Sequence, residues 1–343
     1  LEIVEADMNA GPSPSWRTSP FRIACLSEAA RPEHWVLVLA GPHSYCDGIS
    51  LAWLAHELLL AIATGEVGDP LRLQSISIDP LSEREDEEPG PTGTRYVAAE
   101  ADVPAEPSRR SLVRTKLLQA SLTPEITQSL VHEVKRKGLT VHGAIGAAAH
   151  LALAVRHAKV TGESQYGVYK AGSPVSMRPH VKPPLTDADI RMAVDVALTD
   201  TAVSANDRFW SLAQRFGEGV CKQIDYLYFL RSWQRTTKKD REIGSTGVPI
   251  PLISNVGRSA LQPDYGPLAI EDVAGAMATH GMFQIAMLFT TFNDRLGGSF
   301  YFETPTVDQA SMVQFVRLTM DILSSPEVHK GDPAIAMLLD IVE

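Results

Sequence analysis

The stretch HWVLVLAGPHSYCDGISLAWLAHELLLAIATG, residues 34–65, decides the fold. The apolar residues at 34–40 predict a buried strand. In residues 49–64 the apolar positions recur at helical spacing, and this predicts a helix with one buried face, made of Leu51, Leu54, Ala55, Leu58 and Ile62. The connection between strand and helix holds His43, with Asp47 and Gly48 following it.

Three interpretations of His43 compete. In the first, its ring nitrogens are hydrogen-bonded within the core or a loop and it has no chemical role. In the second, it binds a metal together with Cys46 and Asp47. In the third, it is a general base at the mouth of the loop. In the third case Asp47 holds the loop rigid and Gly48 lets another group approach the backbone closely. Neutral imidazole is suited to removing a proton from a hydroxyl or amine near neutral pH. No second cluster of ligands lies nearby, and this counts against the metal site.

The rest of the chain mixes strands and helices irregularly, which predicts an α/β fold with two lobes. A strand at 21–26 should pair with 34–40, and "FNDRL" predicts a hairpin turn. Further strands are expected in "RTKLLQASL" and at 166–172, 193–199, 248–254, 283–291 and 296–303, and helices at 124–137, 140–158, 207–229 and 306–324. Thr123 is the expected cap of the 124–137 helix, which should stop at Gly138.

Residues 83–109 have a different composition. They contain four prolines, two glycines and eight acidic residues but few large apolar side chains. Such a segment cannot bury enough surface to form a core, so a crossover loop is predicted. We expect a first lobe over residues 1–110, this crossover included, and a second lobe over 111–343.

Bulk composition excludes some functions. The formal net charge of −10 over 343 residues leaves no basic excess for nucleic-acid binding. No apolar run approaches the roughly 20 residues of a membrane span. The three cysteines, at positions 25, 46 and 221, are scattered and lack CxxC spacing, which predicts reduced thiols in a cytoplasmic protein.

The segment PHSYCDGIS, residues 42–50, resembles the HHxxxDG motif of the chloramphenicol acetyltransferase-like superfamily. This superfamily includes condensation domains, polyketide-associated acyltransferases and alcohol acetyltransferases. Other segments also resemble the superfamily and stand in the expected order. SPFRIACL precedes the motif, and GLTVHGAIGAAAHLAL, AGSPVSMRP, LISNVGRSAL and DYGPLAIEDVAG follow it. The resemblance implies a two-lobed sandwich with an active-site tunnel between the lobes.

The resemblance also implies roles for individual residues. His43 matches the catalytic base, Gly48 the motif glycine, and Asp47 a structural aspartate that pairs with a buried arginine, for which Arg178 is the candidate. Ser254 or Asn255 could donate a hydrogen bond to an oxyanion, although a turn-forming role is the simpler interpretation of Asn255. His280 could line the tunnel or lie in a loop. For His142 and His150, eight residues apart on an apolar helix, packing is expected.

The sequence departs from the family at several places. Pro42 replaces the first histidine of the motif, which puts the loop geometry in doubt. Asp264, Tyr265 and Gly266 only echo the DFGWG motif of plant members. Family members usually carry several dozen more residues before the strand at 21–26, so the resemblance implies that an N-terminal segment is missing.

The resemblance implies transfer of an acyl group from acyl-CoA or a phosphopantetheinyl carrier protein to a small-molecule hydroxyl, or less favourably to an amine. The thioester is a co-substrate, and no bound cofactor or metal is expected. The alternatives are an amide-forming condensation enzyme, and a repurposed member that serves as a binding module or cyclase.

Overall fold

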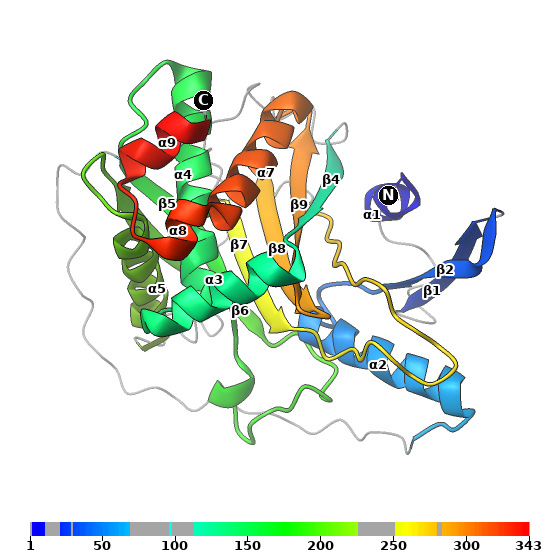
Figure 1. Ribbon diagram of the computed structural model, residues 1–343. Helices are drawn as coiled ribbons and strands as arrows, with labels where there is room; N and C mark the ends of the chain where they lie inside the picture. Colours follow the sequence, from blue (N-terminus) through cyan, green and yellow to red (C-terminus); the bar gives the residue numbers. More distant parts are fainter. Residues whose placement is uncertain are drawn as a thin grey trace, which may run out of the picture.

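A mixed seven-stranded sheet organises most of the chain (Figure 1). The computed structural model describes residues 2–10, 21–28, 30–68, 96–97, 113–225, 251–279 and 283–342. The strand order is β3-β5-β7-β8-β9-β4, with β6 paired to β5. Their bounds are β3 Tyr96–Val97, β4 Arg114–Ser121, β5 Gly167–Ser176, β6 Val194–Val203, β7 Leu252–Arg258, β8 Ile285–Phe292 and β9 Arg295–Thr304. β3, β5, β7 and β8 are mutually parallel neighbours, whereas β6, β9 and β4 pair antiparallel. The predicted α/β class is confirmed.

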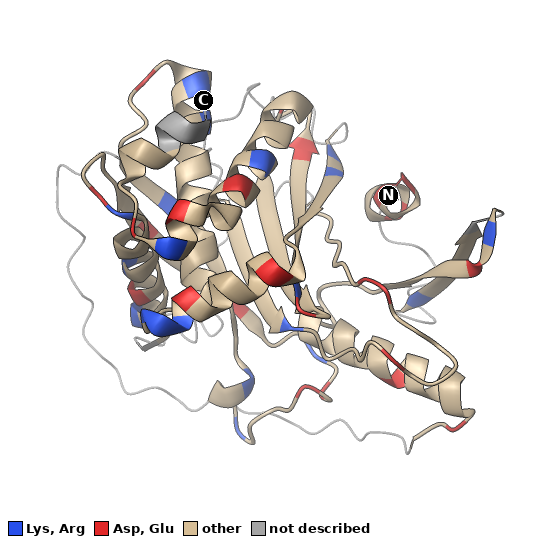
Figure 2. Ribbon diagram, in the orientation of Figure 1, with Lys and Arg blue, Asp and Glu red and all other residues tan. Residues whose placement is uncertain are grey.

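Helices cover one face of this sheet (Figure 1). They are α3 Pro124–Arg136, α4 Val141–Thr161, α5 Phe209–Asp225, α7 Gln309–Ser324, α8 Pro326–Lys330 and α9 Ile335–Val342. Between them and the strands lies the main core, in which Ile145, Phe216, Phe300 and Phe315 are almost fully buried. The strands carry few charged residues, whereas both signs are spread over the outer faces of the helices (Figure 2). The fold is therefore driven by burial of the helix–sheet interface.

The N-terminal elements lie on the side away from these helices (Figure 1). They are α1 Glu2–Asn9, the antiparallel pair β1 Arg22–Glu28 and β2 Arg31–Ala40, and α2 Gly48–Thr64. The predicted pairing of 21–26 with 34–40 is confirmed. So is the hairpin turn between β8 and β9, where Asn293 and Asp294 have φ of 46° and 58°. These left-handed values suit the twist of a tight hairpin.

Most predicted elements are present within the described residues, with bounds that differ by a few positions. Thr123 caps α3 by accepting a hydrogen bond from the amide of Ile126, and Gly138 follows the helix with a φ of +68°. Positions 248–250 and 226–229 of the predicted elements lie outside the described residues. Three helices were not predicted, α1, α8 and α9, because their eight, five and eight residues are too few for a clear periodicity.

The predicted buried face of α2 is wrong in part. Ser50 and Leu59 are its buried residues, whereas Ile62 is 50% exposed. Leu51, Leu54, Ala55 and Leu58 are only partly buried. Apolar residues make up most of the helix, with Ser50, His56 and Glu57 among the few exceptions, so periodicity alone could not identify the face that packs.

The prediction of a loop throughout 83–109 is also wrong in part. Tyr96 and Val97 form β3, which pairs in parallel with β5 through Val168 and Tyr169. The rest of the segment lies outside the described residues. The division at residue 110 stays a prediction, and β3, which precedes it, belongs to the sheet of the second half.

Helix α1 packs along the free edge of β4. The amide of Leu117 donates to Glu5 Oε1 at 2.9 Å, and the amide of Thr115 donates to Asn9 Oδ1 at 2.8 Å. Asn9 Nδ2 returns a 2.8 Å bond to the carbonyl of Thr115. These side chains replace the strand that β4 lacks on this edge.

Among the described residues, no single helix is both long and apolar enough to cross a membrane. α3 and α4 meet the combined requirement of length and apolarity as a pair, but they are bent by 106° at the break between them.

Candidate active site

The loop between β2 and α2 is held in a tight conformation. The amide of Tyr45 donates to the carbonyl of Pro42 at 2.9 Å. A Cβ on Gly41 would lie 2.7 Å from the ring of Phe21, so this position has no room for a side chain. The backbone can therefore form the turn with proline in place of the first motif histidine.

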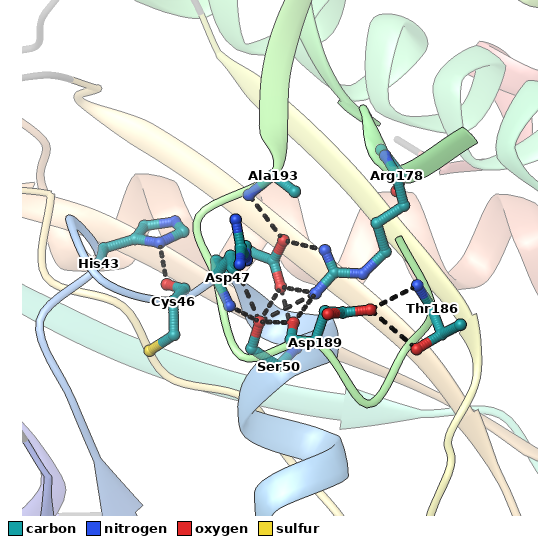
Figure 3. Close-up of polar contacts among 10 residues, drawn as sticks. His43, Cys46, Asp47, Ser50, Arg178, Thr186, Asp189 and Ala193 are labelled. Carbon is teal, nitrogen blue, oxygen red and sulfur yellow. Dashed lines mark hydrogen bonds and ion pairs between the residues drawn. The ribbon is translucent and has the colours of Figure 1, made fainter. Parts of the chain in front are cut away.

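His43 is exposed, and one of its ring nitrogens is engaged (Figure 3). Nδ1 lies 2.9 Å from the carbonyl oxygen of Cys46. Because a carbonyl can only accept, Nδ1 must carry the proton in this bond. In the neutral ring Nε2 is then left with a lone pair, which is what a general base requires.

Asp47 points away from His43 and toward Arg178 (Figure 3). The guanidinium binds both carboxylate oxygens, with Nη1–Oδ2 at 3.0 Å and Nη2–Oδ1 at 3.1 Å. Asp47 is 1% exposed and Arg178 3% exposed. The ion pair that the resemblance implied is thus present, and it is fully desolvated.

Asp47 also begins α2. Its Oδ1 accepts from the amide of Ser50 at 2.9 Å, the usual bond of a helix N-cap. Its Oδ2 accepts from the amide of Ala193 at 3.1 Å. One carboxylate therefore joins the start of α2 to the connection between β5 and β6.

Arg178 in that connection was predicted, but Ser50 and the backbone groups of Asp189 and Arg191 that bind with it were not. Arg178 opens a short 3-10 helix, Arg178–His180, and its Nη2 also donates to the carbonyl of Asp189 at 3.0 Å. Ser50 Oγ, which is fully buried, contacts Arg178 Nη2 at 2.9 Å and the backbone of Arg191. Only the position of Ser50, three residues after the cap Asp47, could have indicated its role.

Gly48 has no very close neighbour among the described residues. An added Cβ would lie 3.8 Å from Val256 Cγ1, an ordinary contact. The close approach suggested by the sequence stays a prediction. The same contact, however, places β7 beside the motif loop.

Ser254 and Asn255 belong to this part of β7. Ser254 is 9% exposed and lies two positions before Val256, in a strand whose register against β8 shifts between Asn255 and Arg258. Asn255 Oδ1 accepts from the amide of Gly257 at 3.0 Å, and Gly257 has a φ of +76°. The side chain of Asn255 thus forms a local turn. His280 lies outside the described residues.

The thiol of Cys46 is buried, 1% exposed. Burial, and then the charge of Asp47, raise the pKa of this thiol to about 11. A protonated thiol is a poor metal ligand. Within the ranges that the structure describes, no group of three or more His, Cys, Asp or Glu side chains could hold a metal ion.

His142 and His150 pack in the core, against the ring of Phe216. His142 Nε2 lies 3.0 Å from Ser173 Oγ, and His150 Nδ1 donates to the carbonyl of Gly146 at 2.6 Å. Burial lowers the pKa of each histidine to about 4, and for His142 the nearby His150 adds to the effect.

A surface cleft of about 210 Å³ lies between α4 and α7, on the helix-covered face of the sheet. Val155, Lys159 and Phe315 are among its lining residues, and none of them belongs to the motif loop. The predicted tunnel between two lobes stays a prediction.

The sheet and the HxxxDG loop with its buried aspartate–arginine pair define a protein of the chloramphenicol acetyltransferase-like superfamily, as predicted. The family described as "Phthiocerol/phthiodiolone dimycocerosyl transferase C-terminus" matches residues 112–297. This is more than half of the chain, which therefore belongs to this family of polyketide-associated acyltransferases.

Solved structures support the same fold. A trichothecene 15-O-acetyltransferase from Fusarium sporotrichioides has a TM-score of 0.62 and 14% identity, over 94% of this chain and 73% of that one. SgcC5 from Streptomyces globisporus has a TM-score of 0.60 and 14% identity, over 97% and 77% of the two chains. At this identity the likenesses establish the two-lobed fold alone.

A third likeness is to a four-domain nonribosomal peptide synthetase, with a TM-score of 0.59 and 14% identity, covering 93% of this chain. The chain spans only 25% of that synthetase. No curated protein in the comparison matches this chain significantly.

Proposed function

We propose that this protein transfers an acyl group from a thioester to the hydroxyl of a small-molecule acceptor, with His43 as the general base. The observation that carries the proposal is the bond from His43 Nδ1 to the carbonyl of Cys46, which leaves Nε2 as the basic nitrogen on an exposed ring. Family membership supports acyl transfer as the class of reaction.

The proposed step needs no covalent acyl-enzyme. Nε2 of His43 removes the proton of the acceptor hydroxyl while the oxygen attacks the thioester carbonyl carbon. The tetrahedral oxyanion then collapses, the C–S bond breaks, and the imidazolium returns the proton to the leaving thiolate. The products are an ester and a free thiol, and His43 regains its starting tautomer.

Asp47 has no direct part in this step. Its carboxylate is committed to Arg178, Ser50 and Ala193, on the side of the loop away from the His43 ring (Figure 3). Its role is to hold the loop against the β5–β6 connection. Arg178 shares that structural role, whereas Gly48, the motif glycine, lies beside Val256 of β7.

Ser254 is our candidate donor to the oxyanion. Its strand runs beside the motif loop, since Val256 of the same strand is the neighbour of Gly48. Asn255 is a weaker candidate because the bond from the Gly257 amide to its Oδ1 turns its side chain back onto its own strand. A hydroxyl aimed at the oxyanion would lower the activation barrier by a few kcal/mol, which raises the rate roughly 10²–10³-fold.

The acyl group would be delivered by acyl-CoA or by a phosphopantetheinyl carrier protein, as a co-substrate. One structural neighbour is described as a 15-O-acetyltransferase, which supports ester formation. Other neighbours are condensation domains. Amide formation is therefore the alternative to ester formation.

The test is a mass-spectrometric transfer assay on the purified protein. A panel of acyl-CoAs and acyl-carrier proteins is offered to pooled alcohols and amines. Wild type is compared with His43→Gln and with Ser44→Ala, which alters the exposed neighbouring residue. We expect an ester whose rate of formation falls by about 10²–10⁴ in His43→Gln and is unchanged in Ser44→Ala.

An equal rate in His43→Gln would refute the role of His43. An amide product would show that the protein is an amide-forming condensation enzyme and not an ester-forming acyltransferase. No transfer with any donor would favour a binding module or a cyclase.

A further inference from the structure

One peptide group links His43 to a distant part of the chain. The carbonyl of Cys46 accepts from His43 Nδ1 at 2.9 Å. The amide of Asp47, on the other side of the same peptide bond, donates to the carbonyl of Arg191 at 3.2 Å. Because a peptide group is planar, fixing the direction of its N–H also fixes the direction of its C=O. The backbone of Arg191 therefore sets where the acceptor of His43 points.

Ser50 in turn holds the backbone of Arg191 at both of its polar atoms. The amide of Arg191 donates to Ser50 Oγ at 3.0 Å, and Ser50 Oγ lies 2.8 Å from the carbonyl of Arg191. Arg178 Nη2 donates to the same hydroxyl at 2.9 Å. A hydroxyl has two acceptor sites and one proton. Both acceptor sites are filled here, and the proton faces three acceptors: the carbonyl of Arg191, Asp47 Oδ1, also at 2.8 Å, and the more distant carbonyl of Asp189 at 3.4 Å.

We infer that Ser50 is a positioning residue for His43. It acts through the backbone of Arg191 and the peptide group between Cys46 and Asp47, and it keeps His43 in the tautomer with the proton on Nδ1. The catalytic consequence rests on the proposed function, because it requires His43 to be the base. The effect on the tautomer does not.

This role can be tested with the helix cap and the ion pair in place. The helix-capping bond uses the backbone amide of Ser50, so it survives in Ser50→Ala. Both bonds of the Asp47–Arg178 ion pair survive as well. The substitution removes the side-chain bonds that hold Arg191, which form the path to His43, together with the hydroxyl's bonds to Asp47 Oδ1 and Arg178 Nη2.

The experiment measures the His43 tautomer directly, by NMR of protein labelled with ¹⁵N-histidine, at a pH where the ring is neutral. The His43 signals are assigned by their loss in His43→Gln. Wild type should show the proton on Nδ1 alone. Ser50→Ala should show a mixture of the two tautomers, and Ser50→Thr, which keeps the hydroxyl, should restore the wild-type spectrum. Ser44→Ala is the matched control and should not change it.

Transfer kinetics give the second measurement. In Ser50→Ala we expect kcat to fall about tenfold with KM within about twofold, since a misdirected base slows the chemical step rather than binding. A purely structural role would lower the amount of folded enzyme and leave the His43 tautomer unchanged.

Wild-type protein with the proton on Nε2 would overturn the inference, and so would Ser50→Ala that keeps the proton on Nδ1 alone. The first of these needs no variant, so the inference can be refuted even if Ser50→Ala does not fold. Absence of transfer activity in wild type, with the tautomer shift present, would refute the proposed function and leave this inference standing.

Discussion

Replacing Asp47 by alanine should be among the most destabilising single changes in the motif loop. It leaves the guanidinium of Arg178 charged and 3% exposed without its carboxylate. Breaking one side of a buried ion pair in this way typically costs about 3–5 kcal/mol. In the variant, Arg178 Nη2 keeps its hydrogen bonds to the carbonyl of Asp189, at 3.0 Å, and to Ser50 Oγ, at 2.9 Å. We therefore take the lower end of this range, about 3 kcal/mol. Loss of the α2 cap adds about 1 kcal/mol. The expected total is about 4 kcal/mol.

The assay is urea unfolding at pH 7, followed by circular dichroism. Asp7→Ala is the matched control, because it breaks the ion pair of Asp7 with Arg22, in which the side chains are 37% and 27% exposed. Such a partly exposed pair should contribute about 1 kcal/mol or less. Asp47→Ala combined with Arg178→Met should recover part of the loss, since the buried charge is then removed as well.

The reasoning fails if Asp47→Ala costs no more than Asp7→Ala. It also fails if the double variant is as unstable as the sum of the two single variants, because the two side chains would then not be coupled.

Three further predictions concern the core and a turn. Because burial holds the pKa of His150 at about 4, below its unfolded value near 6.5, the unfolded state takes up a proton first as the pH falls. This histidine should therefore leave stability unchanged above pH 6.5 and reduce it by about 3 kcal/mol between pH 6.5 and pH 4. Urea unfolding at several pH values measures this as the slope of the unfolding free energy against pH. The slope should be smaller in His150→Leu. Gly146→Ala should lower the unfolding free energy by about 1–3 kcal/mol, because the added Cβ would overlap the ring of Phe216. Gly217→Ala on α5 is the control: its Cβ would have no atom within 4 Å, so it should be neutral or stabilising. Equal melting temperatures of the two variants would contradict this. Asn293→Val should lower the unfolding free energy by about 1–3 kcal/mol and Asn293→Gly should not, because φ is 46° at this position; comparing the urea midpoints of the two variants checks it.

Local sequence signals predicted the elements of the site well. The apolar run at 34–40 and the helical spacing after it correctly gave strand, loop and helix around His43. Thr123 and Gly138 correctly marked the two ends of α3, since capping is decided by neighbouring residues. The resemblance to the superfamily supplied Arg178 as the partner of Asp47, although 131 residues separate them in the chain.

Local signals failed where an element's surroundings come from elsewhere in the chain. The periodicity of α2 suggested a buried face that includes Ile62, which is half exposed. The composition of 83–109 predicted a loop, yet Tyr96 and Val97 pair with β5. Both outcomes depend on which surfaces meet in the folded chain, and periodicity carries no information about that.

By itself, then, the sequence determined which residue types stand in the motif loop and that a strand precedes it and a helix follows it. These properties depend on neighbouring residues through spacing, capping and turn chemistry. Tertiary structure decided what those residues contact. The backbone of Arg191 and the hydroxyl of Ser50, joined at 2.8 and 3.0 Å, reach His43 only because the β5–β6 connection folds against the start of α2. Backbone groups are the same in every residue, so no sequence pattern could have indicated which carbonyl would orient the loop that holds His43.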